Sequence, residues 1–125
     1  MDLYTEDVLD HSEHPRNMGE LTGEGVLLAK DSNASCGDMV QFYIQIVGES
    51  ANQRISQVKW RGIGCAITTA AASKLSEWLV GKNLDEIKKM SEEELVESGV
   101  GFTVNPGRSK CLTLPVRVLK KLVEN

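Results

Sequence analysis

Three cysteines are spread along the 125-residue chain, each beside a signal for a turn or a helix start. Cys36 follows a turn-forming stretch, Cys65 follows a glycine-rich bend, and Cys111 precedes an amphipathic segment. Buried structural cysteines usually occupy apolar stripes, whereas thiols at helix N-termini have lowered pKa values and react or bind metals. An odd number of cysteines fits a disulfide framework poorly. We therefore expect these thiols to act as ligands or nucleophiles.

The motif Cys36-Gly37-Asp38 places a thiolate and a carboxylate where both can reach one metal ion, because glycine permits a tight turn. Thiolate is a soft donor that holds iron or zinc well, while carboxylate is harder and a weaker partner for a cluster. Such a pair suits a site that must both hold and release a metal. As a three-residue pattern it also occurs in ordinary turns.

The other two cysteines have distinct surroundings. Glycines in Gly62-Ile63-Gly64-Cys65 allow close backbone approach to an anionic group at a helix N-terminus. Arg108 and Lys110 flank Cys111, and both cations should favour its thiolate, as a persulfide-accepting nucleophile requires. The alternative is that they are ordinary solvated surface charges, as isolated basic residues usually are. No two cysteines stand in a Cys-x-x-Cys spacing, which excludes zinc-ribbon and ferredoxin patterns.

The remaining aromatic and imidazole side chains predict structure rather than chemistry. We expect His11 and His14 to be surface or capping residues rather than ligands. We expect Trp60 and Trp78 to belong to the core.

Hydrophobic periodicity predicts strands first and helices afterwards. Residues 40–46 alternate with a period of two, and residues 24–31 and 54–61 also read as strands, joined by short connections into an antiparallel meander. Residues 67–79 then repeat every four positions, as on one face of a helix, and Gly81 ends that helix. The pattern predicts an α+β fold of two layers, a three-stranded antiparallel sheet with helices packed on one face, in one domain spanning 1–125.

Shorter helices are predicted around these elements. We expect a short helix over residues 4–10, followed by a break over residues 11–19. Two more short helices are expected over residues 84–90 and 91–98, and Ser91 and Glu94 form a capping-box pattern at the start of the second. Residues 99–108 read as a loop. Because Pro115 is tolerated only in a first helical turn, we expect the last helix to start close to Cys111.

Composition narrows the function classes. Hydrophobic residues make up 41% and charged residues 26%, typical of a globular protein, and the formal net charge of −4 argues against nucleic-acid binding. No apolar run approaches the length needed to cross a bilayer, and the N-terminal residues show no secretory signal. We expect no membrane partner and a cytoplasmic location.

Taken together, these motifs resemble the NifU/IscU family of iron–sulfur cluster assembly scaffolds over nearly the whole chain. The matching segments are Tyr4, 10–19, Asn33-Ala34-Ser35-Cys36-Gly37-Asp38, Gly64-Cys65-Ala66-Ile67, Glu77-Trp78-Leu79-Val80-Gly81-Lys82 and Cys111. The resemblance implies a non-enzymatic scaffold that receives sulfur from a cysteine desulfurase, binds iron, forms a [2Fe–2S] cluster and passes it to acceptor proteins. It leaves open whether one chain holds the cluster or a homodimer shares it.

Carried over by position, the resemblance implies a ligand set of Cys36, Asp38, Cys65 and Cys111. Cys111 would be the sulfur acceptor, and Asp38 would keep the cluster labile. Many family members carry His before the third cysteine, where this chain has Lys110. A protonated lysine is a poor ligand, so three sulfurs and one oxygen are favoured.

A second difference from the family pattern, after Lys110, concerns the proteins that would interact with this chain. The family's Leu-Pro-Pro-Val-Lys motif is absent, with residues 103–108 in its place, which argues against transfer assisted by a dedicated Hsp70-type chaperone. A basic residue before the third cysteine is similar to the SufU branch, which binds zinc and relays sulfur. That branch normally has an insertion between the second and third cysteines, for which this chain leaves no obvious room, so we prefer the scaffold.

Other functions stay as alternatives. The runner-up is a zinc-bound persulfide relay, because three thiolates and a carboxylate also suit tetrahedral zinc. A metal-free cysteine hydrolase using Cys111 would need a nearby base, and both histidines lie near the N-terminus. A purely structural zinc module would unfold on chelation, whereas a scaffold would keep its fold.

Overall fold

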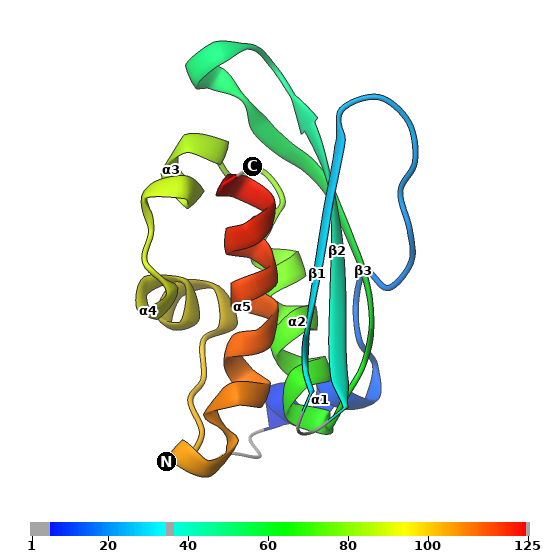
Figure 1. Ribbon diagram of the computed structural model, residues 1–125, viewed down its shortest axis with the longest axis vertical. Helices are drawn as coiled ribbons and strands as arrows, with labels where there is room; N and C mark the ends of the chain where they lie inside the picture. Colours follow the sequence, from blue (N-terminus) through cyan, green and yellow to red (C-terminus); the bar gives the residue numbers. More distant parts are fainter. Residues whose placement is uncertain (1–5, 35–36, 125) are drawn as a thin grey trace.

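The computed structural model describes residues 6–34 and 37–124. Its sheet has three antiparallel strands in the order β1 (Val26–Asn33), β2 (Asp38–Val47) and β3 (Arg54–Ile63). Helices α2 (Ala66–Leu79) and α5 (Ser109–Glu124) lie against one face of this sheet (Figure 1). The predicted α+β fold with helices on one face of a three-stranded meander is confirmed.

Smaller elements complete the helical layer. Helix α1 (Glu6–Glu13) packs on α2, while α3 (Leu84–Lys89) and α4 (Glu92–Leu95) lie beyond α5 from the sheet (Figure 1). Short turns occupy Ser50–Asn52, Val96–Val100 and Pro106–Arg108. After α1, the chain follows the outer edge of β3, where the N–H of Gly19 and the carbonyl of Asn17 both bond Trp60. No described helix has the length and hydropathy needed to span a membrane.

The core lies between the sheet and the two long helices. The period-two pattern of β2 turns Val40, Phe42 and Ile44 toward the helices, and all three are fully buried. The opposing helical residues, also fully buried, are Leu75 and Leu79 of α2 with Leu114 and Leu119 of α5. Burying a side chain of this size contributes about 1.5–3 kcal/mol. This core fixes how the ends of the elements meet.

The hairpin between β1 and β2 fixes where β2 begins. Asn33 pairs with Asp38 as the last rung of the ladder, and the N–H of Gly37 donates to the Asn33 carbonyl at 2.9 Å. Gly37 has φ +75°, a left-handed conformation that glycine adopts without steric cost. The turn therefore places Asp38 at the end of the sheet, as the first residue of β2.

Residues 99–108 were predicted to form a loop, but the first two of them belong to a helical turn that packs against α2. The capping box of Ser91 and Glu94 is present, as predicted, but the helix continues through a π-type turn over Val96–Val100. A Cβ on Gly99 would lie 2.6 Å from Leu75 Cδ1. Gly99 is thus packed against α2, and the loop starts only at Gly101, whose φ of +78° ends the helical turn.

The last helix starts close to Cys111, as predicted, but Pro115 does not lie in its first turn, and the predicted end of the first helix is wrong. Helix α5 begins at Ser109, so Pro115 lies in its second turn. Because proline has no N–H, the Cys111 carbonyl lacks its usual i+4 donor. Helix α1 continues to Glu13 instead of breaking at His11, because His11 is buried against α2.

Candidate metal centre

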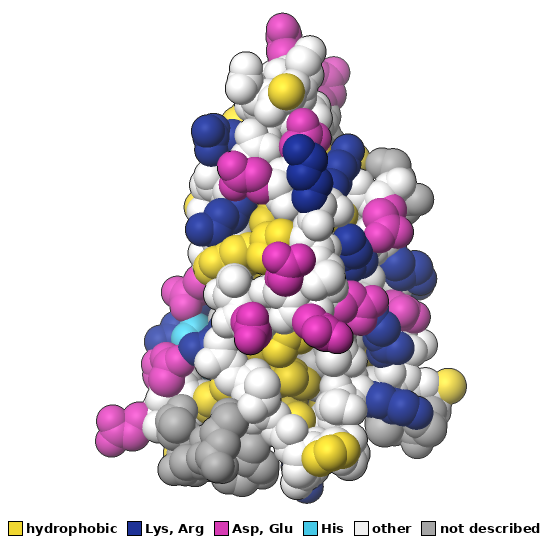
Figure 2. Space-filling model, turned by 90° about the vertical axis from the view of Figure 1, so that its left-hand side faces the viewer, with side chains coloured by type: hydrophobic (Ala, Val, Ile, Leu, Met, Phe, Trp, Pro, Cys, Tyr) yellow, Lys and Arg dark blue, Asp and Glu magenta, His cyan; other side chains and the backbone are white. Residues whose placement is uncertain are grey.

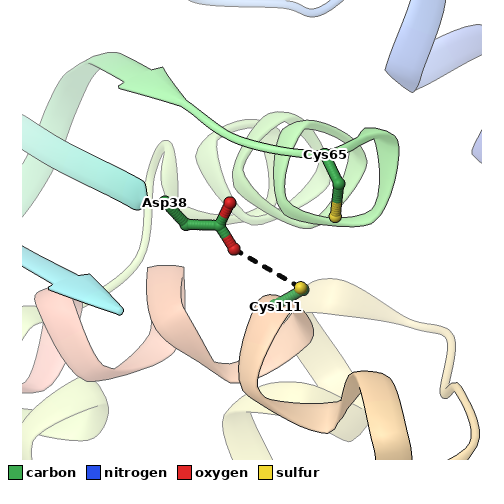
Figure 3. A group of neighbouring side chains, drawn as sticks. All are labelled: Asp38, Cys65 and Cys111. Carbon is green, nitrogen blue, oxygen red and sulfur yellow. Dashed lines mark hydrogen bonds between the residues drawn. The ribbon is translucent and has the colours of Figure 1, made fainter. Parts of the chain in front are cut away.

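Three of the four predicted site residues meet at one end of the fold. Asp38 comes from the start of β2, Cys65 from the bend before α2, and Cys111 from the first turn of α5 (Figure 3). One ligand atom of each lies within 4.8 Å of the others. The fourth predicted residue, Cys36, lies outside the described residues.

Asp38 is the hydrogen-bond acceptor of the group. Its carboxylate is buried, and Oδ2 accepts from the Cys111 thiol at 3.4 Å and from the Thr68 hydroxyl at 3.4 Å. A carboxylate so deep in a protein requires such donors or a cation to offset its lost hydration. The side chain is therefore held in place before any metal binds.

Cys65 is the N-cap residue of α2, with extended backbone at φ −74° and ψ 174°. Its Sγ lies 3.7 Å from the Thr68 hydroxyl, and the backbone N–H groups of Ile67 and Thr68 favour its thiolate form. Burial alone would raise the pKa of this thiol. The donors from Thr68, Cys111 and Ile67 outweigh burial and lower the pKa below its ordinary value.

The pKa of Cys111 is shifted in the opposite direction from that of Cys65. Burial, followed by the neighbouring Cys65 and Asp38, raises the pKa of its thiol to about 12. The expectation that Arg108 and Lys110 would favour its thiolate is wrong for the metal-free site, because both cations are exposed to solvent while burial, Cys65 and Asp38 all raise the pKa. Their exposure agrees with the alternative that they are solvated surface charges. In this geometry the proton stays on Cys111 and is donated to Asp38.

Gly64 lets the three elements approach. A Cβ on this residue would lie 2.9 Å from Thr68 Cβ and 3.2 Å from Asp38 Oδ1. The glycine-rich bend was predicted to permit close approach to a cluster, and the structure shows that it permits close approach of α2 to the acid that begins β2.

Two further residues shape the site and were missed from the sequence. Thr68 stands three positions after Cys65, the spacing at which a side chain in the first turn meets the N-cap residue. Buried Asn33 donates to the Lys110 carbonyl at 3.0 Å and accepts from the Arg117 guanidinium, which ties β1 to the start of α5. The Thr68 spacing was readable in advance, but the long-range role of Asn33 was not.

His11 does not have the surface or capping place predicted for it. It is buried, its Nδ1 lies 2.7 Å from Ser73 Oγ, and its Nε2 faces Glu77 at 3.4 Å and Asp7 at 3.7 Å. These contacts join α1 to α2, so the residue is structural. His14 is exposed, as expected.

Both tryptophans contribute to the core, as predicted. Trp60 is buried, and its indole N–H donates to the Arg16 carbonyl at 2.8 Å. Trp78 is half-buried and packs against the core, with the Lys82 ammonium 4.9 Å from its ring centroid.

The donor set fits a soft divalent cation. Two sulfurs and one carboxylate oxygen, already within 4.8 Å, resemble the mixed sulfur and oxygen sets that hold zinc or iron. Binding would displace the Cys111 proton, since a coordinating thiol is deprotonated by the cation. The site can therefore hold a metal, on condition that it gives up at least one proton.

Comparison with known proteins agrees with this geometry. Residues 3–125 match the model of the NifU-like N-terminal domain. The chain belongs to that family, and the resemblance inferred from its motifs is confirmed.

Similar proteins come from several branches. The IscU iron–sulfur cluster assembly scaffold of Haemophilus influenzae is 33% identical, covering 96% of this chain and 92% of that protein. The corresponding Escherichia coli K12 scaffold is 32% identical, covering 96% and 91%. A bifunctional NifU/MnmA protein of Rubrobacter xylanophilus is 31% identical over 94% of this chain, which spans only 23% of its length.

A solved structure extends the comparison to the fold. The SUF-system scaffold from Fervidobacterium islandicum, described as putative in its crystal structure, superposes with a TM-score of 0.75 at 27% identity, covering 96% of each chain. The similarity thus includes both IscU and SufU proteins.

Proposed function

We propose that this protein is a scaffold that assembles a labile [2Fe–2S] cluster on Cys36, Asp38, Cys65 and Cys111 and passes it to acceptor proteins. The observation that carries the proposal is the convergence of Asp38, Cys65 and Cys111 within 4.8 Å from three separate elements. Family membership and the IscU relatives support the same role.

Sulfur enters at Cys111 in this proposal. A cysteine desulfurase presents a persulfide, the Cys111 thiolate attacks its terminal sulfur, and the donor cysteine leaves as a thiolate. Cys111 must first lose its proton, which its raised pKa opposes. An iron ion bound by Asp38 and Cys65 supplies positive charge beside the thiol and lowers that barrier. Two electrons from an external reductant then convert each transferred sulfur to sulfide.

Asp38 makes the site reversible. Carboxylate is a harder and weaker cluster ligand than thiolate, so the bond to Asp38 is the easiest of the four to exchange. Its hydrogen bonds from Thr68 and Cys111 provide an alternative set of partners when the cluster leaves. The ligand set thus favours transfer over permanent storage.

Anaerobic reconstitution with iron, cysteine, a reductant and a cysteine desulfurase tests the proposal. We expect a visible cluster chromophore with iron and sulfide in equal amounts, and loss of that chromophore in Cys65→Ser. A colourless protein that binds zinc and still takes up persulfide would favour the zinc relay instead. Cys111→Ser should abolish sulfur uptake in either case. Sulfur uptake that persists in this variant would contradict the role of Cys111 as the sulfur acceptor.

Location and binding partners remain predictions. The cytoplasmic location, a homodimer on cluster binding and the absence of nucleic-acid binding rest on sequence and resemblance alone.

A further inference from the structure

A groove between α4 and the start of α5 lies on the face of the molecule away from the sheet. Its volume is about 440 Å³. We name it the α4–α5 groove; its lining residues are Ser91, Glu92, Glu93, Glu94, Val96, Glu97, Thr103, Leu112 and Thr113. The groove shares Val96, Glu97 and Thr103 with a second hollow of about 250 Å³ that reaches Phe102. Because they share these residues, the two hollows adjoin and form one depression.

The floor of this depression is apolar. Val96 is half-buried, while Phe102 and Leu112 are buried residues of the hydrophobic core whose edges reach the groove. Figure 2 faces this side and shows hydrophobic side chains exposed between and below the carboxylates. An apolar floor of this kind accepts one or two bulky side chains of a ligand.

The rim carries charge of a single sign. Glu92, Glu93, Glu94 and Glu97 all line the groove and are exposed, and none of the described lining residues is a lysine or arginine. Of these four side chains, Glu94 accepts a hydrogen bond from the backbone N–H of Ser91 in the capping box. The other three carboxylates thus stand around an apolar floor with no described cation in the groove to balance them.

We propose that the α4–α5 groove docks a segment of a partner protein that has one or two bulky apolar side chains flanked by lysine or arginine. The apolar side chains lie on Val96, Phe102 and Leu112, and the cations face the glutamates. Charge complementarity selects this occupant, because complementary potentials steer association and repel acidic surfaces. A second copy of this chain, with its net charge of −4, fits the rim poorly.

The position of the groove gives docking a consequence. Leu112 and Thr113 line it, and Cys111 is the preceding residue of the same helical turn. A segment bound there brings its protein next to the thiol proposed to accept sulfur. For this one point the inference rests on the proposed function; the binding itself does not.

A defined peptide tests the groove on the metal-free protein, so the result is independent of cluster assembly. The probe is the acetylated and amidated hexapeptide Lys-Arg-Leu-Phe-Lys-Arg, added to ¹⁵N-labelled protein while backbone amide shifts are followed. We expect saturable shifts centred on Val96, Glu97, Thr103 and Leu112. We also expect the dissociation constant to rise about fivefold in the double variant E93Q/E97Q, which keeps the capping box intact.

Three controls make the outcome decisive. The double variant E24Q/E49Q removes the same charge from exposed positions outside the groove and should bind as the parent does. Peptides with two alanines in place of Leu-Phe, or with acidic residues in place of the basic ones, should bind at least about fivefold more weakly. Equal binding of either control peptide, shifts centred elsewhere, or concentration-dependent shifts at the groove without peptide would overturn the proposal.

Discussion

The thiol of Cys111 donates to the carboxylate of Asp38 at 3.4 Å, across 73 positions of sequence. This contact joins the first turn of α5 to the first residue of β2, and it makes Asp38 both a candidate ligand and the acceptor of the proton that must leave. The two functions compete, because a carboxylate bound to a metal no longer raises the pKa of its neighbour. In the proposed function, metal binding at this site is therefore coupled to the reactivity of Cys111.

Asp38→Ala should make a reconstituted cluster last longer, because the weakest and most exchangeable ligand is removed while the thiolates remain. In the metal-free protein the same change should lower the pKa of Cys111 from about 12 toward its ordinary value, since a source of negative charge and an acceptor are lost. Cluster decay followed by visible absorbance, and thiolate absorbance against pH, measure the two effects. Asp31→Ala, a partly exposed acid on β1, is the control. A cluster that decays faster or at the parental rate would count against this role.

The two described thiols should differ sharply in reactivity. At pH 8, with Cys36→Ala as the background, we expect iodoacetamide to modify Cys65 at least about tenfold faster than Cys111, because thiolate rather than thiol is the nucleophile. Both side chains have intermediate exposure, so access does not decide the order. Cys65→Ser should accelerate modification of Cys111 by removing the adjacent charge. Peptide mapping by mass spectrometry gives both rates, and faster labelling of Cys111 in the parent would refute the assignment.

The architecture was readable from the sequence because it follows from local patterns. The period-two run in β2 and the period-four run in α2 each specify one buried face, and the order of strands and helices leaves few ways to pack them. The cysteines were recognisable as site residues because each stands at the end of such an element. The convergence of Cys65 and Cys111 on Asp38 is a consequence of that placement.

The properties that the sequence did not predict depend on contacts between segments that are distant in the chain. The raised pKa of Cys111 arises from Asp38 and Cys65, which are 73 and 46 positions away, whereas the neighbouring cations that suggested the opposite are exposed to solvent. The burial of His11 depends on Ser73 in another helix. A sequence window shows neither the burial nor the partner that decides each case.

Thr68 should tune Cys65 through its hydroxyl. Thr68→Val keeps the shape of the side chain but removes the hydroxyl that contacts both Asp38 and the Cys65 sulfur, so the pKa of Cys65 should rise toward its ordinary value. Stability should fall by about 1 kcal/mol, because the buried carboxylate loses one partner. Thiolate absorbance against pH and urea unfolding provide the readouts. Thr68→Ser retains the hydroxyl and should behave like the parent; a shift of equal size in both variants would show that the hydroxyl is not the cause.

Gly64 should not tolerate a side chain. Gly64→Ala would place a Cβ 2.9 Å from Thr68 and 3.2 Å from Asp38, which forces the start of α2 away from β2. We expect a loss of about 1–3 kcal/mol, as for overpacked cores, together with weaker zinc binding. Gly107→Ala is the matched control, since its Cβ would meet only Asn105 Oδ1 at 3.5 Å and its φ is not positive. Equal stability of the two variants in urea would contradict the close approach seen here.

His11 should make the docking of α1 sensitive to acid. Burial, followed by the charge of Arg16, holds its pKa below the ordinary value despite the carboxylates of Asp7 and Glu77. The unfolded chain then takes up a proton near pH 6.5 while the folded chain resists it until lower pH, so stability is present above about pH 6.5 and declines as the pH falls below that value.

The hydrogen bonds around the His11 imidazole also favour its neutral form, which agrees with a loss of stability at low pH. Ser73 Oγ accepts from the Arg16 backbone N–H at 2.9 Å, which leaves its own proton free to donate to Nδ1 of a neutral ring. Protonation of Nδ1 would replace this acceptor with a second donor. Urea midpoints at pH 7.5, 6.5 and 5.5 should therefore decrease in the parent and flatten in His11→Gln, with exposed His14→Gln as the control. A midpoint that rises on acidification, or an unchanged slope in His11→Gln, would show that His11 does not set the acid response.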